Sequence, residues 1–273
     1  MITIDAEAYL KNHSHPALYS QRIRKTVTPQ PFDIYPGVTE SPVLLVCDHA
    51  SSRIPNDLND LGLTVSQRDS HIAADRGALP LSLALREKLL CTVFASTCSR
   101  LVIDMNRPPD HSEAIIEKSE ATVIPGNIGI SVAERERRIT TLFNPYHKAL
   151  NQKILSICEQ HTICFLISIH SFTPVYLGVT RPWEIGILWN KDDRLAKPLL
   201  SDLRQSGYSV GDNQPYSGRD PAGYTIRTHA EDKGLPHVLI EVRDDVLRDA
   251  ISFEHISRFL GGHFQNIIKN WTG

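Results

Sequence analysis

Short, nearly continuous apolar runs recur along the chain, and polar residues follow them. Residues 43–46 are all apolar and lead into Asp48 and His49, and residues 163–169 are almost all apolar and lead into His170. Runs without polar alternation predict strands that are buried on both faces, as in parallel sheets covered by helices. We expect further strands at residues 91–95, 100–104, 184–189 and 237–242.

Segments of helical character separate these predicted strands. A leucine-rich segment at 79–90 has apolar positions spaced closely enough to cover a sheet, and 132–154 predicts one or two helices. Strands that alternate with helices predict an α/β fold with three α/β/α layers around a mixed, mostly parallel sheet. The remaining expectations are a short helix or turn at 56–62, a helix at 194–206, turns at 213–224 and helices after 242.

Length and composition favour one soluble domain. The chain has 273 residues, and we expect residues 1–273 to form a single α/β domain with residues 1–40 as an N-terminal arm packed on it. Hydrophobic residues make up 41% and charged residues 22%, as is ordinary for a globular protein. The net charge of −2 argues against a nucleic-acid or membrane partner held by bulk electrostatics.

The cysteines and the N-terminus predict a cytoplasmic location. Five cysteines form no CxxC pair and several lie inside apolar runs, which is typical of reduced, buried thiols. The N-terminus has neither the basic start nor the apolar core of a signal peptide. No stretch approaches the ~18 apolar residues of a membrane span. Nothing in the sequence indicates an oligomeric state.

Residues at the ends of the predicted strands are the candidates for chemistry. The carboxyl ends of parallel strands converge at one edge of a sheet, where ligands collect. His49 and His170 both follow buried-type strands and offer the imidazole nitrogens that zinc prefers. Asp75, at the start of a helix expected near the first strand, is our candidate for the third ligand. Its alternative role is that of an acid favoured by the helix dipole.

Glu241 lies inside an apolar strand, where a carboxylate is costly to bury unless it is paired or functional. The functional interpretation is a general base that takes a proton from water beside a metal. The alternative is a buried ion pair with Arg243, two positions further on.

Several basic residues are candidates for binding a substrate. Arg107 follows a predicted strand end, and its guanidinium suits a carboxylate, with Asn106 as a second donor. Arg100 is a candidate for polarising a carbonyl, unless it merely begins its strand. Arg227 and His229 are further candidates, although residues 223–229 also have the alternation of an edge strand. His147 is expected to be a structural hydrogen-bonding residue.

Other catalytic motifs are absent from the sequence. The chain has no Gly-x-Ser-x-Gly elbow of a serine hydrolase, and Gly178 and Gly186 stand in no phosphate-binding loop. Cys47 lies inside an apolar run, where a thiol is more often inert than nucleophilic.

Together these residues resemble the N-formylglutamate amidohydrolase family, a branch of the zinc-carboxypeptidase-like hydrolases. The resemblance runs from about residue 43 to residue 247, and the block at 100–109 is its most specific part. The resemblance also rests on residues 49–55, Asp75, residues 145–147, His170, residues 223–229 and residues 240–241.

The resemblance implies a zinc-carboxypeptidase-like fold and metal-dependent hydrolysis of the amide in a small N-acyl amino acid. It implies that Asn106 and Arg107 hold the substrate carboxylate, that Glu241 is the base and that His170 binds zinc or another divalent metal. Related enzymes carry a glutamate ligand three residues after the first histidine, where this chain has Ser52.

Because Ser52 replaces that glutamate, we expect Asp75 to supply the carboxylate. Two alternatives stay open: a carboxypeptidase-like peptidase or deacylase for another N-acyl amino acid, and a metal-free binding protein that has kept the pocket. The segment 218–223 also suggests a substrate preference different from formylglutamate.

Overall fold

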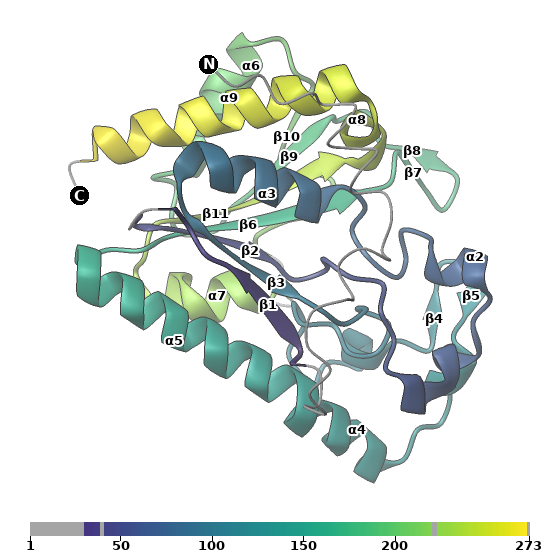
Figure 1. Ribbon diagram of the computed structural model, residues 1–273. Helices are drawn as coiled ribbons and strands as arrows, with labels where there is room; N and C mark the ends of the chain where they lie inside the picture. The colour runs from purple at the N-terminus through teal and green to yellow at the C-terminus, as the bar shows by residue number, and fades with distance from the viewer. Residues whose placement is uncertain (1–29, 39–40, 220–222, 272–273) are drawn as a thin grey trace.

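The computed structural model describes residues 30–38, 41–219 and 223–271 (Figure 1). Its centre is a seven-stranded sheet in the order β1-β3-β2-β6-β11-β9-β10. The neighbours β3, β2, β6 and β11 are parallel, whereas β1 is antiparallel to β3 and β9 is antiparallel to β11. The strands are β1 (Phe32–Tyr35), β2 (Val43–Cys47), β3 (Thr92–Ser96), β6 (Phe165–Phe172), β9 (Ile185–Leu188), β10 (Val210–Asp212) and β11 (His237–Arg243).

Helices cover both faces of this sheet, which gives the three-layer α/β/α arrangement that the sequence predicts (Figure 1). One face carries α3 (Ala78–Leu89), α6 (Ala196–Gln205) and α9 (Ala250–Lys269). The other carries α5 (Asn144–His161) and α7 (Thr225–His229). A π-helical turn (Ile139–Phe143) joins α4 (Val132–Arg138) directly to α5, so the predicted helix at 132–154 is continuous.

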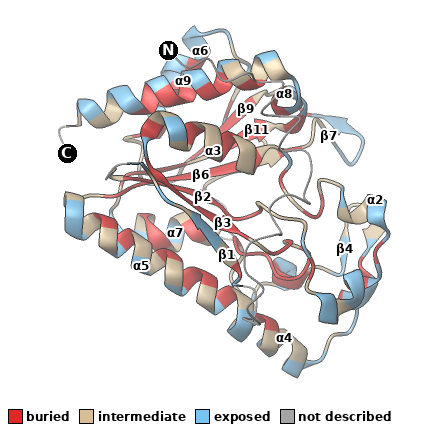
Figure 2. Ribbon diagram, in the orientation of Figure 1, coloured by how far each residue is buried: buried red, intermediate tan, exposed pale blue. Residues whose placement is uncertain are grey.

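The apolar strands are buried on both faces because each face has its own core. In β2, Val43 and Leu45 pack in the core under α3, whereas Leu44 and Val46 pack in the core under α5. Burial is continuous along the central strands, while the outer sides of α5 and α9 are exposed (Figure 2). The uninterrupted apolar pattern of residues 43–46 follows directly from this two-sided burial.

Short elements surround the sheet and its covering helices. They are η2 (Asn56–Gly62), α2 (Val65–Arg68), η3 (Ser112–Ile115), the hairpin of β4 (Lys118–Ser119) and β5 (Thr122–Val123), η4 (Pro125–Asn127), the hairpin of β7 (Val175–Tyr176) and β8 (Val179–Thr180), η6 (Glu231–Lys233) and α8 (Asp244–Arg248). No helix within the described residues is long and apolar enough to cross a membrane.

The predicted strand at 100–104 is wrong. The segment is a series of turns, because side chains rather than a neighbouring strand satisfy its carbonyl groups. Asn127 Nδ2 donates to Leu101 O at 2.8 Å, and Arg138 Nη1 donates to Val102 O at 2.9 Å. Its apolar side chains are buried, so burial alone produced the strand-like pattern.

Two other expectations concern residues 223–229 and the N-terminal arm. Residues 225–229 form helix α7, so the edge-strand interpretation of that stretch is wrong. Within the predicted N-terminal arm, residues 32–35 form the edge strand β1 against β3. The rest of the arm falls largely on residues 1–29 and 39–40, which lie outside the described part of the chain.

A candidate metal centre at the carboxyl ends of the central strands

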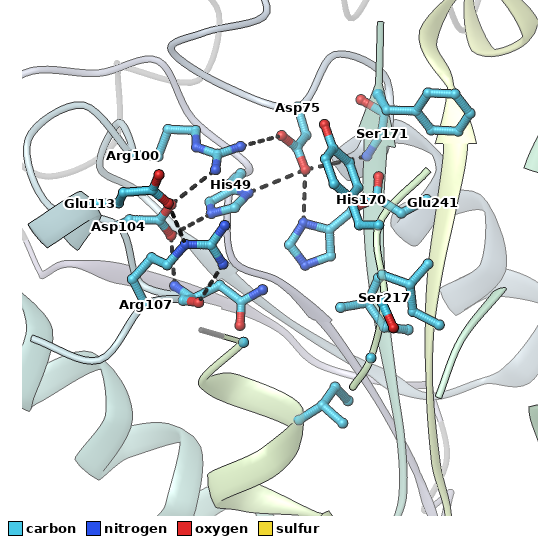
Figure 3. Close-up of a pocket in the computed structure, with 18 of the residues that line it drawn as sticks. His49, Asp75, Arg100, Asp104, Arg107, Glu113, His170, Ser171, Ser217 and Glu241 are labelled. Carbon is cyan, nitrogen blue, oxygen red and sulfur yellow. Dashed lines mark hydrogen bonds and ion pairs between the residues drawn. The ribbon is translucent and has the colours of Figure 1, made fainter. Parts of the chain in front are cut away.

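The sheet brings His49, Asp75 and His170 together. His49 follows β2, His170 lies in the neighbouring strand β6, and Asp75 lies just before α3, which packs over both strands. One ligand atom from each of these buried residues lies within 4.8 Å of the others. Asp75 Oδ2 is 3.3 Å from His49 Nδ1 and 2.8 Å from His170 Nδ1 (Figure 3). Two imidazoles and one carboxylate are the donor set of many catalytic zinc sites.

The second nitrogen of each imidazole faces another buried carboxylate. His49 Nε2 is 2.7 Å from Asp104 Oδ1, and His170 Nε2 is 3.5 Å from Asp48 Oδ2 and 3.1 Å from the Ser168 hydroxyl. Histidines that bind metals usually donate their other ring N–H to a carboxylate or a carbonyl, which fixes the tautomer and the ring orientation. Both Nδ1 atoms are therefore oriented toward the shared oxygen of Asp75, and the residues present fit a divalent cation.

Carboxylates and cationic groups are closely coupled in this cluster. Burial lowers the pKa of His170, but hydrogen bonds to Asp48 and Asp75 outweigh it and raise the pKa to about 10. Burial acts against ionisation of Asp75 and Asp104 too, yet nearby imidazoles hold the pKa of both carboxyls well below the ordinary range. Positive charge on the imidazoles and on Arg100, 3.0 Å from Asp104 Oδ2, stabilises these carboxylates, and a cation bound between them would do the same.

Glu241 lies beside this cluster in β11. It pairs in register with His170 of β6 on one side and with Gly186 of β9 on the other. Its Oε2 atom is buried without a hydrogen-bond partner among the described residues, and burial raises the pKa of the carboxyl to about 7. The alternative ion pair with Arg243 is not formed, because Arg243 Nε donates to Asp245 Oδ1 at 2.7 Å. A carboxyl with these properties can both accept and return a proton near neutral pH.

The segment after the turns at 100–104 carries the predicted substrate-binding residues. Arg100 lies 3.0 Å from Asp104 Oδ2 and 3.5 Å from Asp75 Oδ1. Asn106 uses its Oδ1 atom to accept from the backbone N–H groups of Tyr224 and Thr225, each at 3.0 Å. Its Nδ2 group is thus the end of the amide that remains for a ligand.

Arg107 follows Asn106 in sequence, and both residues line a cavity that they share with the histidines and Asp75 (Figure 3). Its Nε atom is 3.6 Å from Glu113 Oε2, and the Glu113 side chain is 57% exposed. Because such an exposed pair is weak, an incoming carboxylate can compete for the guanidinium.

Arg227 and His229 have different places in α7. Arg227 lines the cavity, whereas His229 is buried away from its lining. His229 Nε2 donates to His147 Nδ1 at 2.9 Å, and His147 Nε2 donates to Met105 O at 2.9 Å. The carbonyl of Met105 can only accept, so this series of hydrogen bonds fixes the tautomers of both His147 and His229. His147 is a structural hydrogen-bonding residue, as expected, and His229 belongs to the same buried hydrogen-bond network.

A cavity of about 260 Å³ joins these groups. That volume suits a small molecule, with the cluster at one end and basic side chains close by. Eight of the nine site residues predicted from the sequence line it: His49, Asp75, Arg100, Asn106, Arg107, His170, Arg227 and Glu241. His229 is the exception.

Sequence reasoning assigned no role to Asp48 and Asp104. Asp48 is completely buried, and its Oδ1 atom accepts hydrogen bonds from Tyr146 and Thr225 at 2.8 and 2.9 Å. Both aspartates directly follow apolar residues, Cys47 and Ile103. An acidic residue at the end of a buried apolar run is the signal that identifies them.

Fold and site define a class: an α/β protein with a buried candidate metal centre beside an acid–base glutamate. The model of the N-formylglutamate amidohydrolase family matches residues 41–248. The chain belongs to that family. A curated relative, the N-formylglutamate deformylase of Pseudomonas putida, is 25% identical over 211 residues, which cover 70% of this chain and 75% of the relative.

Two solved structures extend the comparison. The gene product Atu2144 from Agrobacterium tumefaciens is 36% identical with a TM-score of 0.83, and the match covers 88% of this chain and 95% of that one. The N-formylglutamate amidohydrolase from Ralstonia eutropha JMP134 has a TM-score of 0.63 at 22% identity, covering 88% and 97% of the two chains. The second likeness is one of fold.

Proposed function

We propose that this protein is a metal-dependent amidohydrolase that cleaves the amide of a small N-acyl amino acid of the N-formylglutamate type. The observation that carries the proposal is Glu241, whose unpartnered buried oxygen lies beside the cluster of His49, Asp75 and His170. Family membership and the name of the curated relative support the reaction class.

His49, Asp75 and His170 would hold the metal, with Asp104 and Asp48 orienting the two imidazoles. A bound zinc ion supplies Lewis acidity, which lowers the pKa of water and polarises a carbonyl. In this proposal, Asp75 is the carboxylate ligand in place of the glutamate that related enzymes carry at the position of Ser52. The aspartate therefore removes the main reason for regarding the protein as a metal-free binding protein.

The protein's own groups account for the remaining steps. Asn106 and Arg107 hold the substrate carboxylate, which places the amide at the cluster, and Arg100 stabilises negative charge on the carbonyl oxygen. Glu241 accepts a proton from water as the oxygen attacks the carbonyl carbon. Glu241 then returns the proton to the nitrogen as the C–N bond breaks, giving a carboxylic acid and a free amino acid.

The test is Glu241→Gln, measured by the release of formate from N-formylglutamate and related N-formyl amino acids. The variant keeps the size of the side chain but has no basic oxygen, so we expect a loss of about a hundredfold or more in kcat. Circular dichroism and the metal content should match those of the unaltered protein. Full activity in a folded variant would exclude this mechanism.

Elemental analysis of protein purified without chelators tests the metal itself. We expect one divalent ion per chain, and a metal-free protein that still hydrolyses N-formyl amino acids would contradict the proposal. A panel of N-formyl and longer N-acyl amino acids, with short peptides, separates this activity from that of a deacylase or peptidase. A cytoplasmic location and a single domain over residues 1–273 remain predictions.

A further inference from the structure

The cavity continues beyond the candidate metal centre along strand β11. His237, Leu239 and Glu241 alternate along β11, so their side chains lie on the same face of the sheet, and all three line the cavity. The four residue steps from Glu241 to His237 correspond to about 13 Å along the strand. The cavity thus has a second end, away from the part of β11 that lies beside the candidate metal centre.

This second end presents a buried imidazole nitrogen without a partner. His237 is 1% exposed, and its Nδ1 atom lies 2.8 Å from Leu235 O. A carbonyl oxygen only accepts, so Nδ1 donates to it and Nε2 is the ring nitrogen that remains for a ligand. Nε2 has no hydrogen-bond partner among the described residues.

Glu231 provides a carboxylate oxygen opposite that nitrogen. Its Oε2 atom lies 4.0 Å from His237 Nε2, too far for a hydrogen bond, while Oε1 accepts from Asn190 Nδ2 at 2.9 Å. The exposed Lys191 lies 3.5 Å from the same Oε1 atom, a weak surface pair that does not involve Oε2. One nitrogen placed about 2.8 Å from both acceptors could donate to each of them. The neighbouring Asp192 is paired with Arg194 at 2.6 Å and lies 3.7 Å from His237 Nδ1 rather than from Nε2, which leaves Nε2 and Glu231 Oε2 as a pair of acceptors. Two acceptors suit an N–H donor better than a metal ion, which takes four or more ligands.

We propose that His237 and Glu231 form a distal subsite for a hydrogen-bond donor, above all a primary ammonium group, at the far end of the substrate. This inference rests on the proposed hydrolysis and names the substrate class more closely. Basic residues surround the near end, where the α-carboxylate binds, and an acidic residue lies at the far end. A second carboxylate, as in formylglutamate, would be repelled by Glu231, whereas a cationic end is attracted.

The test compares substrates that differ only at the far end. N-formyl-lysine carries an ammonium group that N-formyl-norleucine lacks, and we expect kcat/KM to favour the lysine compound by about tenfold or more. Glu231→Gln should reduce this preference about tenfold, whereas Glu254→Gln, the same change in a surface ion pair with Arg258, should leave the preference unchanged.

A second pair of substrates places the ammonium group on the acyl side. It consists of 6-aminohexanoyl-glutamate and hexanoyl-glutamate. A preference for the amine in either pair, lost in Glu231→Gln, supports the subsite and identifies the part of the substrate that reaches it. Equal rates within both pairs, or a preference that Glu231→Gln does not change, would overturn the proposal.

Absence of hydrolysis for every compound would count against the proposed function rather than against the subsite. Calorimetric titration of Glu241→Gln with the same four compounds then decides the matter. Tighter binding of the amines, abolished by adding Glu231→Gln, supports the subsite. Equal affinities for amine and hydrocarbon would refute it.

Discussion

At the scale of single residues, the site consists of polar groups that burial makes unusual. Asp48, Asp104 and Glu241 are nearly inaccessible, in a part of the sheet where carboxylates are costly. Asp104 faces His49 Nε2 at 2.7 Å and Asp48 accepts from Tyr146 and Thr225, whereas Glu241 combines an oxygen without a hydrogen-bond partner among the described residues with a raised pKa. Their differing surroundings suit the two roles we propose, a positioning carboxylate and an acid–base carboxylate.

Asp104→Asn tests the positioning role. The amide keeps the size of the side chain but loses the negative charge that faces His49 Nε2, so we expect metal affinity to fall about ten- to a hundredfold. Competition with a coloured chelator measures the affinity. Asp110→Asn, at an exposed position in the same loop, is the matched control. Equal affinities for the two variants would contradict the role of Asp104.

At the scale of elements, helix α7 is tied to the substrate-binding segment at both ends. Its first residues donate to Asn106 Oδ1, and its last residue, His229, connects through His147 to Met105 O. The helix has five residues and cannot be stable alone. Its place therefore depends on these contacts, and they in turn hold Asn106 and Arg107 in position.

The buried imidazole of His147 predicts a pH-dependent stability. Burial lowers its pKa from 6.5 to about 4. The His147 imidazole therefore binds a proton near pH 6.5 in the unfolded chain but only near pH 4 in the folded protein. As the pH falls between these values, the unfolded state is favoured and the stability contributed by the neutral ring is lost. From pH 7 to pH 5 the loss is about 2 kcal/mol.

Urea unfolding of the protein and of His147→Asn at both pH values measures this effect. The difference in unfolding free energy between the two should shrink by about 2 kcal/mol at pH 5, since the titrating groups that do not contact His147 cancel. An unchanged difference would mean that the ring is not buried in its neutral form. If the variant does not fold, NMR titration of the His147 ring in the intact protein provides the same test.

At the scale of the whole molecule, the fold joins ligands from β2, β6 and the start of α3, so a bound metal would link separate parts of the chain. Binding to the folded state alone stabilises it by about 2.7 kcal/mol at a ligand concentration one hundred times Kd. For a chain of this size, that corresponds to an increase of about 5–10 °C in Tm.

Thermal unfolding with zinc and with chelator tests this linkage. We expect the increase in Tm for the unaltered protein and for His255→Gln, which changes an exposed histidine on α9. We expect no increase for His49→Asn, which removes one ligand. The same increase in all three proteins would place the metal elsewhere.

The sequence by itself determined the layers and most of the chemistry. Nearly uninterrupted apolar runs are typical of strands with a core on each face, so residues 43–46 and 163–169 indicated a covered, mostly parallel sheet. The polar residues that end those runs marked His49 and His170, because a buried polar group needs a partner or a function. Glu241 stood out for the same reason.

Only the tertiary structure decided which of these groups face one another. The turns at 100–104 are as apolar as a strand, and their nature depends on distant side chains from Asn127 and Arg138. His229 and Arg227 are two positions apart in sequence, yet one is buried against His147 and the other lines the cavity. Such outcomes depend on contacts across many residues, which local pattern does not encode. Burial can be inferred from the sequence, whereas partners are set by the fold.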